Sequence, residues 1–262
     1  MTFLEVYLTG LLAATVLMTI LWLISLAIKD SSIVDIFWGF GFVVVGATYF
    51  ALTPDGFGTR KLLLLALVAI WGLRLSLHIG YRNIGKGEDF RYAKWRQEHG
   101  ASWWWMSFFR VFLLQGVILW VVSIPLLAAQ WSATPANLTF IDYLGVIVWI
   151  IGFAFEAGGD WQLMQFKRNP ANKGKVLNTG FWRYTRHPNY FGDATQWWGF
   201  WLIAAAAGGW WTVYSPLIMT FLLVRVSGVA LLEKSLKETR PAYREYMETT
   251  PAFFPWFPRK KR

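Results

Sequence analysis

Residues 180–193 form a basic and polar run with the side chains best suited to chemistry in this chain. The run reads Gly180-Phe-Trp-Arg-Tyr-Thr-Arg-His-Pro-Asn-Tyr-Phe-Gly-Asp193. Pro188 suits the first turn of a helix, because its missing N–H costs nothing there. Asn189 and Asp193 lie four residues apart and therefore share one helical face. Cations thus meet free backbone N–H groups at a helix N-terminus, an arrangement that favours binding of an anionic cofactor.

Polar side chains also interrupt the apolar segments, where an ionisable residue is a functional candidate because it is costly to place in a membrane. Trp71, Arg74 and His78 are spaced i, i+3 and i+7, which puts them on one helical stripe. Arg74 could instead pair with a carboxylate, and His78 could be a packed histidine. The remaining ionisable or amide side chains of this kind are Asp35, Glu156, Asp160, Asn189, Asp193, Gln196 and Arg225. None of them has a convincing metal-ligand spacing, and the chain has no cysteine.

The elements that position these residues are expected to be membrane-spanning helices. Hydrophobic residues make up 56% of the 262 residues, and charged residues only 15%, against about 25% in a soluble domain. A span needs about 20 apolar residues. The sequence predicts one all-α polytopic domain over residues 1–262, with seven spans at about 6–28, 33–53, 61–81, 108–130, 140–164, 188–207 and 210–231.

The distribution of basic residues predicts the orientation. Of the 25 Lys and Arg, two lie on one predicted side (Arg60 and Lys61) and two inside spans (Arg74 and Arg225), which leaves 21 on the other side. The positive-inside rule then predicts an outside N-terminus and a cytoplasmic C-terminus. The same rule accounts for the net charge of +10, so nucleic acid is not expected as a partner. No cleavable signal peptide is expected.

The run 181–193 resembles the C-terminal cofactor motif of the steroid 5-alpha-reductase and sterol reductase superfamily. The stretches Trp71–His78, Gly85–Tyr92 and Phe112–Gly116 are similar to its bacterial branch, labelled DUF1295. This resemblance covers nearly the whole chain. It implies a seven-span enzyme that uses NADPH to reduce a carbon–carbon double bond in a lipid, such as a 3-oxo-Δ4 steroid-like enone.

The resemblance also implies which residues bind the cofactor. Asp160 matches the acidic position of the fifth span, and Lys167 or Arg168 matches its basic partner. Tyr184 precedes the Arg-His-Pro run. With the neighbouring cations and polar groups, the predicted NADPH-binding residues are Asp160, Lys167, Arg168, Lys175, Tyr184, Arg186, His187, Asn189, Asp193 and Arg225.

The predicted catalytic residues are Asp35, Trp71, Arg74 and His78. Steroid reductases hold the substrate ketone with a Glu in the second span and a Tyr in the third. Asp35 and Trp71 stand at those places, and an indole N–H can only donate a hydrogen bond. We expect a protonated Asp35 to donate to the carbonyl, with Arg74 or His78 as alternative sources of positive charge. The donor of the final proton stays open. The protein is expected to be a monomer in a bacterial inner membrane.

Two other functions compete with this reading. Isoprenylcysteine and phospholipid methyltransferases carry a similar Arg-His-Pro-x-Tyr-x-Gly run that binds S-adenosylmethionine, followed by a Glu-Glu pair. Glu233 matches the first of these acids, but Lys234 replaces the second. Asp160 and the upstream motifs favour the reductase. A lipid-binding or transport protein is the third reading, although no paired half-repeats are visible.

Overall fold

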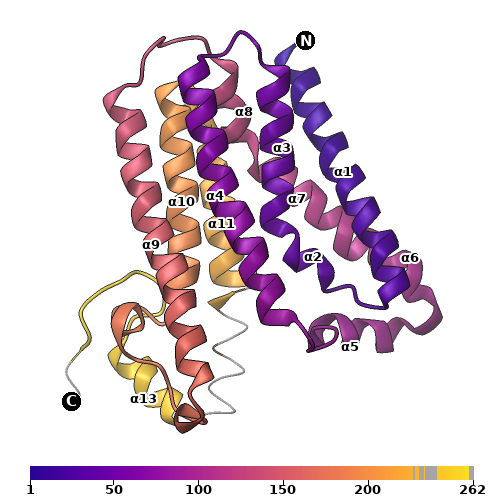
Figure 1. The fold of residues 1–262 in the computed structure, drawn as a ribbon, viewed down its shortest axis with the longest axis vertical. Helices are drawn as coiled ribbons and strands as arrows, with labels where there is room; N and C mark the ends of the chain where they lie inside the picture. The colour runs from indigo at the N-terminus through magenta and orange to yellow at the C-terminus, as the bar shows by residue number, and fades with distance from the viewer. Residues whose placement is uncertain (227, 230–232, 234–240, 260–262) are drawn as a thin grey trace. The chain divides into compact units, whose positions relative to one another are not determined.

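The computed structural model describes residues 1–226, 228, 229, 233 and 241–259 (Figure 1). Every regular element in these residues is a helix, and this described part of the chain has no strand. The all-α class predicted from the sequence is therefore confirmed. The helices group into two compact units, made of residues 1–139 with 204–212 and residues 140–203 with 213–262. Whether the chain forms one domain stays a prediction.

The first unit is an antiparallel helical bundle. Its α-helices are α1 (Phe3–Ile28), α2 (Ile33–Ile36), α3 (Trp38–Leu52), α4 (Gly58–Asn83), α5 (Phe90–His99), α6 (Trp103–Ser107), α7 (Leu114–Val122) and α8 (Ile124–Trp131). A capping box between Thr2 and Glu5 starts α1, and left-handed Lys29 ends it. A π-helical segment, Phe108–Leu113, joins α6 to α7.

Two glycines bring α3 and α4 into backbone contact. A Cβ built on Gly39 would lie 2.5 Å from the carbonyl oxygen of Gly72, and the reverse contact is 2.4 Å. Trp71, next to Gly72, is fully buried and lies 5.5 Å from the Phe42 ring, centroid to centroid. The predicted helical stripe on α4 thus begins at a tightly packed crossing.

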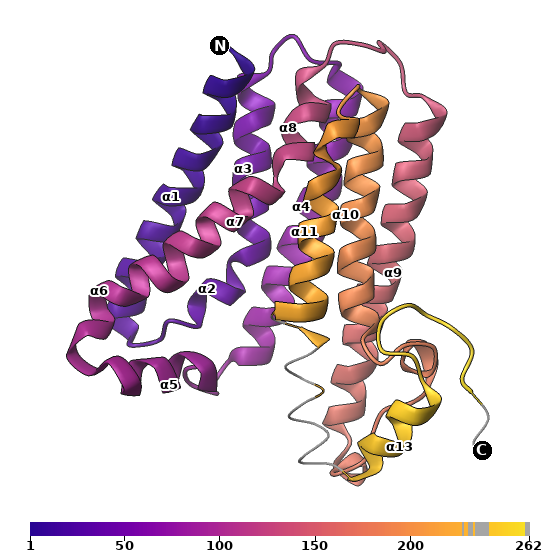
Figure 2. The same cartoon turned by 180° about the vertical axis from the view of Figure 1, so that it is seen from behind.

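The second unit contains α9 (Phe140–Arg168), α11 (Tyr214–Phe221), α13 (Pro241–Thr249) and most of α10 (Pro188–Ala206), whose last residues, 204–206, are assigned to the first unit. These helices are seen from behind in Figure 2. Glycines again set the distance between long helices. A Cβ on Gly152 would lie 2.6 Å from the carbonyl oxygen of Gly192, and one on Gly199 would lie 2.7 Å from that of Gly145. Side chains on the facing surfaces of α9 and α10 are therefore held in a fixed register.

Four helical segments of the described chain are long and apolar enough to cross a membrane, namely Phe3–Ile28, Gly58–Asn83, Phe90–Trp131 and Phe140–Arg168. They coincide with the first, third, fourth and fifth predicted spans. The predicted second span is split at Phe37 into α2 and α3, and its apolar helix Trp38–Leu52 is shorter. The seventh predicted span corresponds to the short apolar segment Trp210–Val226. The count of seven and the orientation of the termini stay predictions.

Candidate functional site

The first turn of α10 packs directly on α9 and brings an amide to a carboxylate. The Asn189 Nδ2 group donates to Asp160 Oδ1 at 3.2 Å, and Asp160 is only 6% exposed. The absence of a side chain at Gly159 permits this contact, because a Cβ there would lie 2.9 Å from the Pro188 ring. Proline in the first turn also suits the start of α10. The acid of the fifth predicted span and the helix N-terminus therefore lie together.

A second polar pair joins the same two helices, one turn before Asp160 on α9 and two turns after Asn189 on α10. Gln196 Nε2 donates to Glu156 Oε2 at 2.5 Å, and both residues are buried. Asp193, one turn beyond Asn189 on α10, is also buried. Burial of polar groups is costly unless hydrogen bonds compensate it. The α9–α10 face thus carries a ladder of acids and amides between apolar surfaces.

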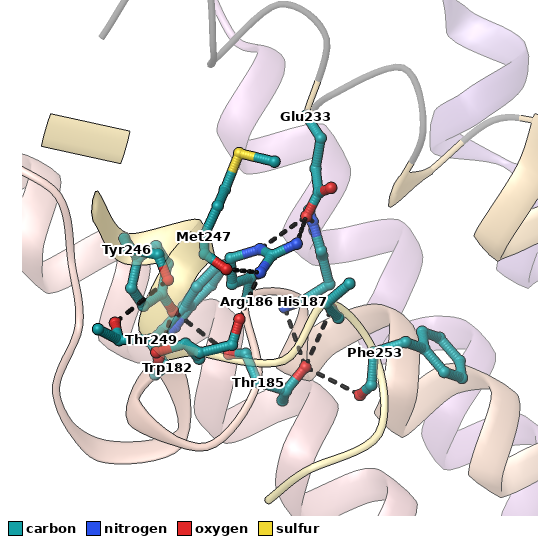
Figure 3. A network of polar contacts seen from close by, with 11 residues as sticks. Trp182, Thr185, Arg186, His187, Glu233, Tyr246, Met247, Thr249 and Phe253 are labelled. Atoms are coloured by element: carbon teal, nitrogen blue, oxygen red, sulfur yellow. Dashed lines mark hydrogen bonds and ion pairs between the residues drawn. The ribbon is translucent and has the colours of Figure 1, made fainter. Parts of the chain in front are cut away.

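Arg186 and His187 both contact Glu233, as Figure 3 shows. The Arg186 Nε group donates to Glu233 Oε1 at 2.7 Å, and Nη2 lies 2.6 Å from the same oxygen. His187 Nε2 lies 3.2 Å from it. The Arg186 Nη1 group donates to the backbone carbonyls of Met247 and Thr250. Arg186 is 7% exposed, so this guanidinium is a buried cation compensated by protein groups.

The electrostatics of this cluster keep Glu233 ionised. Partial burial by itself raises the pKa of the Glu233 carboxyl, but hydrogen bonds from His187 and Arg186 outweigh it and hold the pKa below its usual value. Burial raises the pKa of Tyr243 to about 12, with a further increase from the nearby Glu233 charge. Burial likewise raises the pKa of Tyr246. The phenol of Tyr246 donates to the carbonyl of Trp182.

Residues 250–257, which we call the strap, lie over the Tyr184–His187 segment (Figure 3). The Arg186 N–H donates to the carbonyl of Pro251 at 2.9 Å, and the Trp256 N–H donates to the carbonyl of Tyr184 at 2.9 Å. Thr185 Oγ1 donates to the carbonyls of Ala252 and Phe253. Segments almost 70 residues apart in sequence are therefore joined by both backbone and side-chain bonds.

The remaining predicted cofactor residues of this unit lie at the surface. Tyr184 is 37% exposed, and its ring lies edge-on to that of Phe257. Arg225 is exposed in the π-helical segment Leu222–Val226. The predicted cofactor-binding cations near the end of α9, Lys167, Arg168 and Lys175, are exposed. Exposure leaves such cations accessible to an anionic ligand from solvent.

Asp35, in the first unit, lies in a separate polar cluster. Its carboxylate accepts from Arg91 Nη2 at 2.8 Å and from the Tyr92 hydroxyl at 2.7 Å. Gln115 Nε2 donates to the same hydroxyl at 3.3 Å. Because both groups beside Asp35 are donors, the carboxylate accepts in this arrangement. Donation from a protonated Asp35 to a substrate carbonyl stays a prediction.

The other predicted catalytic residues lie on α4. Trp71 is fully buried, whereas Arg74 and His78 are half-buried. The short helix α2 approaches the last turns of α4, where a Cβ on Gly80 would lie 3.4 Å from the Ile36 side chain. The structure therefore puts Asp35 on an element that packs beside the helix carrying the other three residues.

Glu88 connects the segment before α5 to the turn between α1 and α2 through an ion pair and hydrogen bonds. Glu88 accepts from Arg96 Nε at 2.9 Å and Nη2 at 2.8 Å, and from the Ser31 N–H at 2.7 Å. Burial alone raises the pKa of Glu88, yet these hydrogen bonds bring it below the usual value. These contacts of Glu88 hold α5, and with it Tyr92, beside Asp35.

Sequence reasoning did not assign a site role to Arg91, Tyr92, Glu156, Gln196 or Glu233. The first two belong to the Gly85–Tyr92 stretch that carried the family resemblance, which was a usable signal. Glu156 and Gln196 were visible as polar residues in apolar segments. Glu233 matched a position in the competing methyltransferase motif, but its pairing with Arg186 spans 47 residues and left no local pattern.

Comparison with known proteins gives the following similarities. The family model described as "Protein of unknown function (DUF1295)" matches residues 21–250. An uncharacterized protein of Schizosaccharomyces pombe is 26% identical over 283 aligned residues, covering 95% of this chain and 79% of that protein. No solved structure matches the chain.

Two fungal Delta(14)-sterol reductases are similar to about half of the chain. The one from Ascobolus immersus is 28% identical over 151 residues, which is 52% of this chain and 33% of the reductase. The one from Schizosaccharomyces pombe is 26% identical over 148 residues, or 51% and 33%. The match thus spans about a third of each reductase. Because these relatives are fungal, the bacterial branch and membrane stay predictions. Since the family model covers most of the sequence, the chain belongs to the DUF1295 family.

Proposed function

We propose that this protein is a membrane-embedded, NADPH-dependent reductase of a carbon–carbon double bond in a sterol-like lipid. The similarity to two Delta(14)-sterol reductases supports the reaction class. The observation that carries the proposal is the Asp160–Asn189 contact at the start of α10, with buried Asp193 one turn further. We further propose seven spans, a cytoplasmic C-terminus and a 3-oxo-Δ4 steroid-like enone as substrate.

The donor set of the second unit fits a dinucleotide. Carboxylates at Asp160 and Asp193 and the amide of Asn189 are suited to ribose hydroxyls or a carboxamide. Exposed cations at Lys167, Arg168 and Lys175 are suited to phosphates, to which Arg can bind in a bidentate manner. Tyr184 and Arg225 lie at the surface of the same unit and complete the proposed set.

Arg186 and His187 receive a different role in this proposal. Both contact Glu233, and Arg186 also donates to two carbonyls. A cation that already neutralises a carboxylate offers less charge to a phosphate. Since both residues are also buried, we propose that they fix the loop before α10 in place.

When bound, NADPH would supply the hydride for the β-carbon of the enone. The chain itself would stabilise the negative charge that develops on the carbonyl oxygen, which needs a preorganised donor. We propose that a protonated Asp35 supplies this donor. The Tyr92 hydroxyl, at 2.7 Å, and Arg91 Nη2, at 2.8 Å, would hold its side chain in place. The proposed substrate site would also include three residues of α4, namely Trp71, Arg74 and His78.

Identification of the bound ligand tests the cofactor. Protein purified in mild detergent is extracted, and the released ligand is identified by mass spectrometry. A nicotinamide dinucleotide is expected. Release of S-adenosylmethionine instead would reject the reductase and support the methyltransferase alternative.

Asp193→Ala tests the site. Loss of a hydrogen bond to a charged group costs about 1.5–3 kcal/mol, so NADPH affinity should fall on the order of 10- to 150-fold. Asp55→Ala, at an exposed turn of the other unit, is the matched control and should bind normally. Unchanged affinity in Asp193→Ala would reject the assignment. In Tyr92→Phe we expect NADPH affinity to be retained while the rate of double-bond reduction falls.

A further inference from the structure

The strap presents three large aromatic rings to the outside of the second unit. Phe254, Trp256 and Phe257 are 73%, 72% and 71% exposed, whereas Phe253, the strap residue that packs on Phe191 of α10, is buried. At about 200 Å² per ring, they leave roughly 400 Å² of aromatic surface uncovered. An exposed apolar patch of this size marks a site of interaction.

The strap holds these rings in place. Its backbone bonds to Tyr184 and Arg186 are 2.9 Å long. Prolines at 251, 255 and 258 fix backbone angles around the rings. The patch is therefore preorganised by the same contacts that position the loop before α10.

Contacts with Phe191 of α10 give the level of the patch along that helix. Phe191 lies 5.9 Å from the Phe253 ring and 6.4 Å from the Phe254 ring. On its other side Phe191 lies 5.1 Å from Phe155. Phe191 belongs to the first turn of α10, where the sixth predicted span begins. Phe254 therefore lies at the predicted end of a span, the level at which Trp and Tyr gather in membrane proteins.

Basic residues accompany the rings. Arg259 is exposed, and the sequence continues Lys260-Lys-Arg262, so four consecutive cations follow Phe257 and Pro258. Aromatic rings with adjacent cations complement an anionic membrane surface, where each basic residue contributes about 1 kcal/mol. We propose that the strap docks on the anionic headgroups of the surrounding membrane, with Phe254, Trp256 and Phe257 inserted at the interface.

Docking of the strap would also affect the loop that it covers. Thr185 and Arg186 donate to strap carbonyls, so a strap fixed at the membrane surface restrains the residues just before Pro188. Lipid composition would then control the order of this loop. The docking itself does not depend on the proposed reductase activity.

Site-directed spin labelling tests the proposal, and the chain offers a clean background because it has no cysteine. A label at Pro258→Cys leaves the three rings intact. The full chain is placed in nanodiscs of phosphatidylcholine with or without phosphatidylglycerol. The accessibility of the label to oxygen and to a water-soluble nickel complex is then compared. We expect shielding from nickel in the anionic membrane. Glu248→Cys, exposed on α13, is the matched control and should stay accessible to nickel in both.

Two variants separate the contributions of the cations and of the aromatic rings to membrane docking. Replacing Arg259, Lys260, Lys261 and Arg262 with Gln should lower the docked-to-free ratio roughly 600-fold in anionic membranes, since about 1 kcal/mol for each of the four cations is a factor of about five each. Replacing the three rings with Ser should abolish shielding in every membrane. A nickel-accessible label in the anionic membrane would overturn the proposal. So would equal shielding in both lipids, or spin–spin broadening that disappears on dilution with unlabelled protein, which indicates a second copy.

Discussion

Removing the Glu233 charge should release the strap from the loop before α10. Glu233 Oε1 receives Arg186 Nε at 2.7 Å, Arg186 Nη2 at 2.6 Å and His187 Nε2 at 3.2 Å. Hydrogen bonds to a charged group contribute about 1.5–3 kcal/mol, and neutral ones about 1 kcal/mol. Glu233→Gln keeps an oxygen acceptor but loses the charge. Because its side chain is 17% exposed, we discount the summed loss to about 2 kcal/mol.

Hydrogen exchange measures this loss locally. The amides of Arg186 and Trp256 donate across the loop–strap contact at 2.9 Å, so they exchange only when the contact opens. A cost of about 2 kcal/mol corresponds to roughly 30-fold faster exchange at both amides. Glu98→Gln is the matched control. It removes an exposed pair with Lys94 at 3.7 Å and should leave both amides unchanged.

Arg186→Lys provides an independent check. A lysine cannot reproduce the planar fork that serves Glu233 and two carbonyls at once. Exchange should accelerate at least as much as in Glu233→Gln, and the double variant should add little because the two residues act together. Exchange that changes less than about threefold in Glu233→Gln would refute the reasoning, since the charge would then contribute nothing to the contact.

Three further outcomes follow from the structure. Because the folded-state pKa of Glu233 lies below 4.5, its stabilisation is present above that pH and is lost on further acidification, so strap protection should decline there in the wild type but not in Glu233→Gln. Gly192→Ala should lower the midpoint of thermal unfolding in detergent by several degrees, because its Cβ would lie 2.4 Å from the Glu156 backbone nitrogen, whereas Gly58→Ala meets nothing and should be neutral or stabilising. Glu88→Gln should cost about 1–3 kcal/mol and raise protease sensitivity around α5.

Much of the fold could be predicted because apolar runs of span length leave few alternatives. The predicted spans at about 6–28, 61–81, 108–130 and 140–164 fall inside four long apolar segments. The interruption at Phe37 was not predicted, since an apolar run does not reveal a local change in backbone direction. The π-helical segment Phe108–Leu113 was not predicted for the same reason.

The candidate site could be predicted only where its partners follow helical spacing. Asp160 and Asn189 were both selected from the sequence, and the structure brings them within 3.2 Å. The partners of Arg186 were not predictable, because the strap is irregular and has no periodicity to read. Arg186 was therefore interpreted from its charge alone. Tyr92 was missed for a related reason, since its contact with Asp35 depends on how the charged segment before α5 folds back.

The contact between the loop and the strap also sets an order of events during synthesis. Thr185 donates to a carbonyl 68 residues later in the chain, and the Arg186 side chain donates to the carbonyls of Met247 and Thr250. When α9 and the loop leave the ribosome, those acceptors have not yet been synthesised. Until they are, the Arg186 guanidinium contacts water or a chaperone. The Arg-His-Pro loop is therefore completed late in biogenesis, after most of the helices could already have entered the bilayer.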